Sequence, residues 1–310
     1  MTPLSMRGDN LRFQLLSLAL LVLLAGSYNA SAADTPRIAT VDWTIAETLL
    51  ALGVTPVGVA QTDAYREWVG APPLPDEVVD IGLRAQPNRE LLAQLAPDRI
   101  LLSPMFSTLA PSLGRIAPTD TVALYTPGSD LWTRLKSATR EIAAIADHEA
   151  EADTLLAWLD AHLALLRQTL DTQDVSDRPL LVVQFIDDRH VRVFGEHSLY
   201  NAVMQRLGLE NAWRGTTNYW GFATVGLKAL AQYENARLVI VKPMPVGVEQ
   251  DLETSVLWQH VPAVRSDDVL TLPPVWSFGG APSAMRFAEH LSQALIDASA
   301  TPPTHETPDA

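Results

Sequence analysis

Arg84 is the residue whose surroundings most strongly suggest chemistry, within the stretch DIGLRAQPN at residues 80–88. A planar guanidinium carries forked N–H donors that match paired oxygen atoms. Gly82 permits a tight backbone path, Pro87 restricts the residue before it, and Asn88 is a typical helix N-cap. The stretch predicts an arginine held on a constrained loop at a strand end. An oxygen-rich ligand and bulk solvent are its two alternative partners.

Four tryptophans lie in predicted loops or near the ends of predicted strands, and they come from both halves of the chain. In a parallel α/β sheet, the loops at the carboxyl ends of the strands line the ligand crevice. Aromatic side chains placed there form a rigid, amphipathic wall. Core packing is the alternative for any one of them, but four together favour a binding site. They are Trp43, Trp68, Trp220 and Trp276.

No catalytic signature accompanies these side chains. The sequence has no Gly-x-Ser-x-Gly motif, no phosphate-binding glycine loop and no His-Glu-x-x-His motif. The seven histidines are scattered without metal-ligand spacing, and the absence of cysteine removes thiolate sites, disulfides and iron–sulfur clusters. We therefore expect a binding protein rather than an enzyme, with no catalytic residue, no metal ligand and no cofactor.

The composition narrows the class further. The chain has 310 residues, a hydrophobic content of 47% and a formal net charge of −14. This length allows one large domain or two medium ones. An acidic balance without a basic run argues against nucleic acid as a partner, because phosphate binding needs clustered Lys and Arg.

The N-terminus has the pattern of an export signal. Arg7 and Arg12 form a basic start before an apolar run at residues 13–26, and small residues at 30–32 suit a signal peptidase. No paired arginines precede the run, so we expect a cleaved Sec-type signal peptide ending near residue 32, with an uncleaved membrane anchor as the alternative. Its removal changes the net charge from −14 to about −15. An exported, acidic, cysteine-free chain fits the periplasm.

Predicted strands and helices alternate along the mature chain, which indicates an α/β fold of parallel strands with helical crossovers. We predict strands at residues 37–41, 57–60, 99–103, 121–124, 179–186, 191–194, 237–241 and 269–272. We predict helices at residues 44–52, 88–95, 109–116, 198–207, 226–233 and 283–295.

A long helical stretch separates two similar halves. Residues 131–176 contain no glycine or proline, and leucines recur at three- and four-residue steps after residue 149. A related helix–strand unit occurs on either side, at 92–102 and 230–240. We therefore expect two α/β lobes joined by one long helix, although an ordinary amphipathic helix is the alternative. The expected boundaries are 1–32 (signal peptide), 33–145 (N-terminal lobe), 146–174 (linking helix), 175–298 (C-terminal lobe) and 299–310 (disordered tail).

A series of motifs closely resembles the periplasmic ferric-hydroxamate siderophore-binding proteins, which are class III solute-binding proteins of ABC transporters. The likeness covers about residues 37–295. Its motifs are WTIAETLLALG at 43–53, YREWV at 65–69, PPLPD at 72–76, DIGLRAQPN at 80–88, DDRH at 187–190, VFG at 193–195, NAW at 211–213, TNYWG at 217–221 and VW at 275–276.

The resemblance implies a specific site and specific partners. Two α/β lobes on a helical backbone would enclose a shallow aromatic cleft for an iron(III)-hydroxamate siderophore, which an inner-membrane ABC permease then receives. Arg84 would donate hydrogen bonds to the hydroxamate oxygens, the four tryptophans would form the wall, and the protein would not ligate the iron itself. We also expect a monomer.

The sequence departs from the family at four positions. Phe106 and Phe278 stand where the family often has a tyrosine, and Arg192 stands where it often has an apolar pocket residue. Pro111 occupies a position where a glutamate that contacts the permease is expected. The predicted ligand-binding residues are Arg84, Trp43, Trp68, Phe106, Arg192, Trp220, Trp276 and Phe278.

Other cargoes and one other class of protein remain as alternatives. The same fold could bind a citrate-hydroxamate, a catecholate chelate, haem or cobalamin. A periplasmic siderophore hydrolase would need a nucleophile with a base, and the sequence contains no such pair.

Arg192→Leu tests whether the cleft holds two cations. If Arg192 points into the cleft, the cargo is more anionic than a plain trihydroxamate, and the leucine variant loses affinity for anionic siderophores selectively. Titration with neutral and anionic ferric siderophores measures this preference. An unchanged preference would contradict the idea and leave Arg192 facing solvent.

Overall fold

The computed structural model describes residues 35–173, 175 and 178–300. The predicted signal peptide and residues 301–310 lie outside this part of the chain. The described residues from Pro36 onward belong to one compact unit. Within the described residues, no helix has the length and apolar character that crossing a membrane requires.

The N-terminal lobe contains a five-stranded parallel sheet with the order β3-β2-β1-β6-β7. Its helices follow the strands as crossovers, as the alternating pattern predicted. The strands are β1 (Ile38–Thr40), β2 (Gly58–Val59), β3 (Val79–Asp80), β6 (Arg99–Leu102) and β7 (Thr119–Thr121). The helices are α2 (Trp43–Ala51), α3 (Thr62–Trp68), α4 (Arg89–Leu95), a 3₁₀ segment (Pro104–Leu109) and α5 (Ala110–Leu113), and β4 (Gly82–Leu83) pairs with β5 (Gln86–Pro87) as a small hairpin.

The C-terminal lobe contains a mixed sheet with the order β10-β9-β8-β11-β12. Strands β8, β11 and β12 pair in parallel. Strand β9 pairs antiparallel with β8, because the short turn between them can join only antiparallel neighbours, and β10 pairs antiparallel with β9. The strands are β8 (Leu180–Phe185), β9 (His190–Phe194), β10 (Phe222–Gly226), β11 (Arg237–Val241) and β12 (Val269–Leu272). The helices are α8 (Leu199–Arg206), a 3₁₀ segment (Leu227–Gln232), α9 (Val248–Thr254), α10 (Val256–Gln259), α11 (Pro262–Arg265) and α12 (Ala281–Ala300).

The two sheets have equivalent strand orders. If the strands of each sheet are numbered along the chain, leaving aside the β4–β5 hairpin, both sheets have the order 3-2-1-4-5. The repeated helix–strand units of the sequence end in β6 and β11, which occupy the same position in their sheets. The internal similarity therefore corresponds to two lobes with the same strand order, although β9 runs antiparallel where β2 is parallel.

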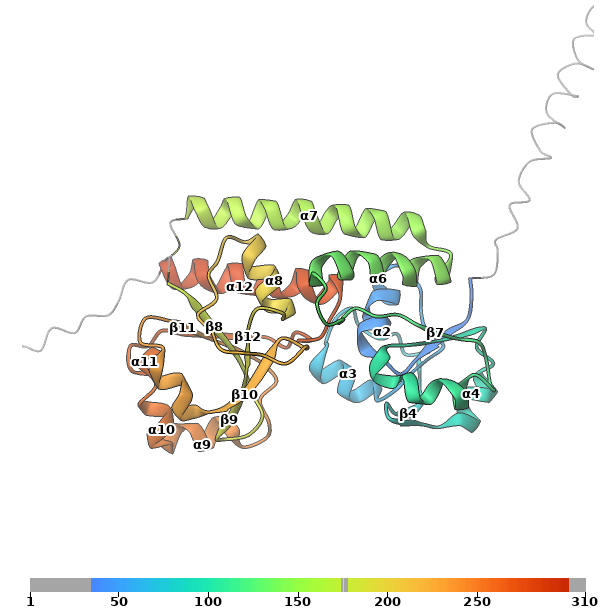
Figure 1. Ribbon diagram of the computed structural model, residues 1–310, viewed down its shortest axis with the longest axis horizontal. Helices are drawn as coiled ribbons and strands as arrows, with labels where there is room; N and C mark the ends of the chain where they lie inside the picture. The colour runs from blue at the N-terminus through green and yellow to red at the C-terminus, as the bar shows by residue number, and fades with distance from the viewer. Residues whose placement is uncertain (1–34, 174, 176–177, 301–310) are drawn as a thin grey trace, which may run out of the picture. The chain divides into compact units, whose positions relative to one another are not determined.

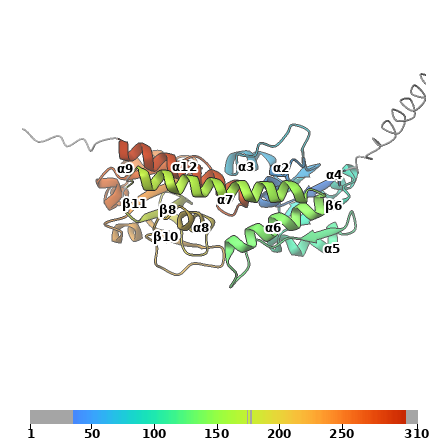
Figure 2. The same cartoon turned by 90° about the horizontal axis from the view of Figure 1, so that it is seen from above.

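Helix α7 (Glu149–Thr172) runs across both lobes (Figures 1 and 2). It packs on α6 (Leu131–Ala146) beside the first sheet and on α8 and α12 beside the second. Its buried face contains Leu156, Leu159 and Leu163, so one apolar stripe serves both lobes. This arrangement is the fold expected from the sequence, two α/β lobes joined by a long helix.

The predicted helical stretch is broken at a position that has neither glycine nor proline. Asp147 has a φ of 57° and lies in the left-handed region, which separates α6 from α7. Aspartate is one of the few residues that adopt this conformation at low cost. The break lets α7 fold back on α6.

Several predicted local structures were wrong. The predicted loop around Trp68 is the end of α3, and the helix predicted at 226–233 is a strand end followed by a 3₁₀ segment. The strand predicted at residues 121–124 lies earlier, at Thr119–Thr121. Helices α9 to α11 were not predicted. These elements are short, so their periodicity is weak and neighbouring packing decides their form. The predicted tail at 299–310 begins too early, since α12 continues to Ala300.

A buried carboxylate joins the two lobes. Glu47 of α2 is fully buried and accepts hydrogen bonds from the Gly280 N–H (2.5 Å) and the Ser283 hydroxyl (2.5 Å) at the start of α12. Arg286 of α12 donates in the same region to the carbonyls of Val69 and Ala71 in the first lobe. A carboxylate at a helix N-terminus satisfies N–H groups that have no partner inside the helix.

Burial raises the pKa of Glu47 to about 7, although the hydrogen bonds from Ser283 and Gly280 and the charge of Arg286 act in the opposite direction. The unfolded chain has the ordinary value of 4.5 for this group. The folded protein therefore binds this proton more tightly than the unfolded chain does. The stabilisation is complete below pH 4.5 and is lost as the pH rises through about 7.

Glu47→Gln tests this linkage. Wild-type protein loses up to about 3 kcal/mol of unfolding free energy between pH 4.5 and pH 8 through this group, because one pKa unit is worth about 1.4 kcal/mol. The glutamine variant is less stable than wild type at low pH, and the difference shrinks or reverses at pH 8. Urea unfolding at the two pH values measures it, with the exposed Glu90→Gln as control. Parallel pH profiles of Glu47→Gln and wild type would contradict the assignment.

Candidate functional site

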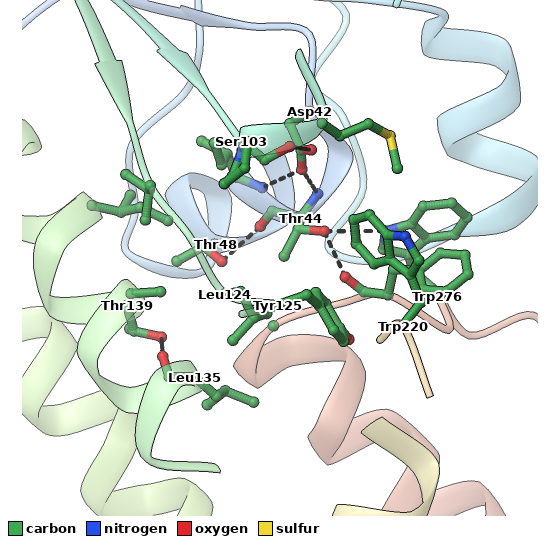
Figure 3. Close-up of a pocket in the computed structure, with 18 of the residues that line it drawn as sticks. Asp42, Thr44, Thr48, Ser103, Leu124, Tyr125, Leu135, Thr139, Trp220 and Trp276 are labelled. Carbon is green, nitrogen blue, oxygen red and sulfur yellow. Dashed lines mark hydrogen bonds between the residues drawn. The ribbon is translucent and has the colours of Figure 1, made fainter. Parts of the chain in front are cut away.

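A cavity of about 330 Å³ is lined by residues of both lobes (Figure 3). The N-terminal lobe supplies polar groups near the start of α2 and in the loops after β4, β6 and β7. The C-terminal lobe supplies aromatic rings from the loops before β10 and after β12. The principal side chains are Asp42, Thr44, Arg84, Ser103, Met105 and Tyr125 from the first lobe and Tyr219, Trp220, Trp276 and Phe278 from the second.

Arg84 lies at the tip of the β4–β5 hairpin and points toward this cavity. Gly82 has a φ of 87°, and its N–H donates to the Asp80 carboxylate, which fixes the start of the hairpin. The Arg84 guanidinium donates from Nε to the carbonyl of Val41 at 3.0 Å. Asn88 caps α4 by accepting from the Leu91 N–H, as the sequence predicted. The constrained loop inferred from the sequence is therefore present.

Three aromatic rings surround the guanidinium. Its central carbon lies 4.3 Å from the ring centre of Trp43, 4.9 Å from that of Phe106 and 5.6 Å from that of Trp276. Contacts of this kind attract a cation through the ring quadrupole. Together the three rings hold the Arg84 side chain, which is 16% exposed, at the edge of the cavity.

Asp42 balances the charge of Arg84. One carboxylate oxygen of Asp42 accepts from the Thr44 N–H at 2.9 Å as the N-cap of α2, and the other accepts from the Ser103 hydroxyl at 2.7 Å. This second oxygen lies 3.7 Å from a terminal nitrogen of Arg84. Burial lowers the pKa of Arg84 and the charge of Asp42 opposes that shift, so the guanidinium stays protonated at any physiological pH.

The aromatic wall is a connected set of rings. The ring centre of Trp276 lies 5.2 Å from that of Phe278, which lies 5.5 Å from that of Trp220. The ring centre of Tyr125 lies 5.2 Å from that of Trp220. Gly221 holds the Trp220 loop in place, because its φ is 81° and a Cβ there would lie 2.2 Å from the backbone nitrogen of Ser198. Tyr125 comes from the first lobe, so the wall continues across the boundary between lobes.

The predicted site residues divide into three groups. Arg84, Trp220, Trp276 and Phe278 line the cavity. Trp43 and Phe106 are buried behind Arg84 and contact its guanidinium rather than the open space. Trp68 and Arg192 are not among the residues that line it.

Two of these positions differ from the expectation for physical reasons. Trp68 ends α3 and packs partly buried in the cluster that contains Trp43 and Trp276. Arg192 lies on β9, which is an inner strand, and its guanidinium is 5.4 Å from the ring centre of Phe222. Phe222 in turn packs on Phe278, 5.7 Å away, so one ring separates Arg192 from a wall residue.

Several lining residues were not predicted from the sequence. Asp42 carried a signal, since an aspartate directly before a helix is a typical N-cap. Thr44 and Ser103 have no distinctive spacing, and their roles follow from contacts made across the fold. Tyr125 and Tyr219 lie in loops whose course no sequence period specifies.

Thr44 also connects the lobes within the cavity wall (Figure 3). Its hydroxyl donates to the carbonyl of Phe278 at 2.7 Å and accepts from the indole N–H of Trp276 at 3.2 Å. One hydroxyl therefore holds two aromatic wall residues of the other lobe. Among the described residues, no group of three His, Asp or Glu side chains could hold a metal ion.

Two lobes with the same strand order, a helix that spans both, and an apolar cavity between them that contains the guanidinium of Arg84 define a solute-binding protein. Residues 38–275 match the family model of periplasmic binding proteins. The chain belongs to this family.

The relatives are more specific. The chain is 35% identical to the iron(3+)-hydroxamate-binding protein FhuD of Escherichia coli strain K12 over 267 residues, which cover 86% of this chain and 89% of the relative. The crystal structure of the Fe3+–Desferal-bound siderophore-binding protein FhuD from Vibrio cholerae has a TM-score of 0.81 and 30% identity, covering 86% of this chain and all of the other. The chain thus resembles FhuD proteins in both sequence and structure.

A more distant structure shows the same fold. The triscatecholate siderophore-binding protein FeuA from Bacillus subtilis, complexed with ferri-bacillibactin, has a TM-score of 0.68 and 19% identity, covering 86% of this chain and 94% of the other. At this identity the likeness extends to the fold alone. The class III arrangement therefore does not by itself select a chelate.

Thr44→Val tests the polar connection between the lobes. It removes one hydroxyl and leaves the Phe278 carbonyl and the Trp276 N–H without that partner, so we expect a loss of about 1–3 kcal/mol of unfolding free energy. Urea unfolding followed by tryptophan fluorescence measures it. Thr48→Val is the matched control, since the Thr48 hydroxyl donates only to the Thr44 carbonyl within α2. Equal losses in the two variants would contradict a role in joining the lobes.

Proposed function

We propose that this protein is the periplasmic solute-binding protein of an ABC importer and that its cargo is an iron(III)-hydroxamate siderophore. The observation that carries the proposal is the single guanidinium set into an apolar, aromatic cavity between the lobes. The identity to FhuD of E. coli and the structural match to a Desferal-bound FhuD support the same cargo.

The cavity suits the chemistry of a ferric hydroxamate. Three hydroxamates already fill the coordination sphere of iron with hard oxygens, so the protein need not supply a metal ligand. A cargo of this kind requires a donor for the iron-bound oxygens and apolar surface for the organic shell. Arg84 is placed to supply the donor, and Trp220, Trp276 and Phe278 supply the surface.

The partners follow from the class. The protein would be exported by a cleaved Sec-type signal peptide, carry its cargo as a monomer without cofactor or catalysis, and deliver it to an inner-membrane ABC permease. The exposed Pro111 of α5 stands where a docking glutamate was expected, so another acidic residue on that lobe would meet the permease.

Arg84→Ala tests the proposal. We expect ferric trihydroxamates to quench the tryptophan fluorescence of wild-type protein saturably, and the affinity of the variant to fall at least tenfold, because a charge-assisted hydrogen bond in a buried site is lost. Iron-free hydroxamates should bind far more weakly than the ferric form.

Arg206→Ala is the matched control. Arg206 also lies over a tryptophan ring, 3.8 Å from the centre of Trp132, but it is not among the residues that line the cavity. Its loss should leave affinity unchanged. The absence of saturable quenching by any ferric hydroxamate with wild-type protein would contradict the proposed cargo.

A further inference from the structure

The charge inside the cavity comes from one pair of residues. Among the described residues that line it, Arg84 and Asp42 are the two that carry charge. Arg192, the other candidate cation, lies over Phe222 and is not part of the lining. The cavity wall is therefore close to electrically neutral, although it contains an arginine.

Asp42 cannot move away when a cargo arrives. Asp42 is 5% exposed, and its carboxylate accepts hydrogen bonds from the backbone N–H groups of Thr44 and Ile45 and from the Ser103 hydroxyl. These donors fix both oxygens, one at the start of α2 and one beside Ser103 (Figure 3). The carboxylate is therefore held in place within the site.

The contact between the two charges is an ion pair without a hydrogen bond. The closest approach of the Arg84 terminal nitrogen to Asp42 is 3.7 Å, longer than a hydrogen bond. The guanidinium donates only through Nε, to Val41, within the described chain. Asp42 thus cancels the charge of Arg84 while leaving its terminal N–H donors available to a cargo.

We propose that Asp42 is the residue that sets the charge selectivity of this site, because it cancels the charge of Arg84 and so removes the advantage that strongly anionic ferric chelates would otherwise have over chelates with a neutral core. This inference rests on the function proposed above. In a low-dielectric cavity Arg84 alone would attract an anionic chelate strongly, and the repulsion from the carboxylate of Asp42 offsets that attraction. A neutral chelate experiences little of this repulsion but still receives hydrogen bonds from Arg84. Selectivity between two cargoes depends on the difference of their affinities, so a repulsive group contributes to it as much as an attractive one.

The test is Asp42→Asn with two cargoes. Asparagine caps a helix as well as aspartate does, so α2 keeps its N-cap while the charge is removed. The neutral probe is the ferric complex of N-acetylated Desferal, and the anionic probe is ferri-bacillibactin. Dissociation constants for both are measured by fluorescence quenching on wild type and variant. The readout is the ratio of the two constants, which a general loss of structure would not change.

Asp130→Asn is the matched control. Asp130 is an exposed N-cap of α6 that accepts from the Thr133 N–H, and it is not among the residues that line the cavity. We expect Asp42→Asn to shift the ratio at least tenfold toward the anionic chelate, and Asp130→Asn to leave it unchanged.

The outcomes separate the two proposals. A ratio unchanged within about threefold in Asp42→Asn, or equal losses for both cargoes, would overturn the role of Asp42 while wild-type binding of the neutral chelate upholds the proposed function. Failure of wild-type protein to bind the neutral chelate would overturn the proposed function itself.

Discussion

The hydrogen bonds that the buried Glu47 side chain accepts from the other lobe are the interaction on which the cavity depends. This side chain connects α2 of one lobe to the first turn of α12 of the other, where Gly280 and Ser283 donate to it. The loop that carries Trp276 and Phe278 ends at this junction, and Thr44, one turn earlier on α2, holds the same two residues. The position of the aromatic wall relative to Arg84 therefore follows from contacts at one helix. Helix α7 adds a second connection, since it packs on both lobes.

The placement of Arg84 shows how a buried cation is tolerated beside an apolar cavity. Taking a guanidinium out of water is costly unless other groups replace the solvent. Here a carbonyl, a carboxylate and three rings do so, and all come from the N-terminal lobe or the loop after β12. The hairpin geometry set by Gly82 and Asp80 brings the side chain to that environment.

Much of this architecture was predictable from the sequence, because its signals are local or periodic. The strands around β1, β6, β8 and β11 are short runs rich in Ile, Leu and Val, and the leucine stripe of α7 is a clear helical period. The break at Asp147 and the helical turn at Trp68 were missed, since a single residue and its packing decide them. For the site, the sequence indicated Arg84 and the loop aromatics. It could not indicate Tyr125 or the pairing of Asp42 with Arg84, which depend on contacts between distant segments, and it left open whether Arg192 faces the cleft.

The most direct test of this account is a crystal structure of the protein with a neutral ferric trihydroxamate, in which anomalous scattering locates the iron. The account predicts the iron in the cavity between the lobes, with its hydroxamate oxygens within about 2.7–3.1 Å of the Arg84 terminal nitrogens. It also predicts that Asp42 makes no contact with the metal. An iron site elsewhere, or one whose oxygens do not reach Arg84, would contradict it.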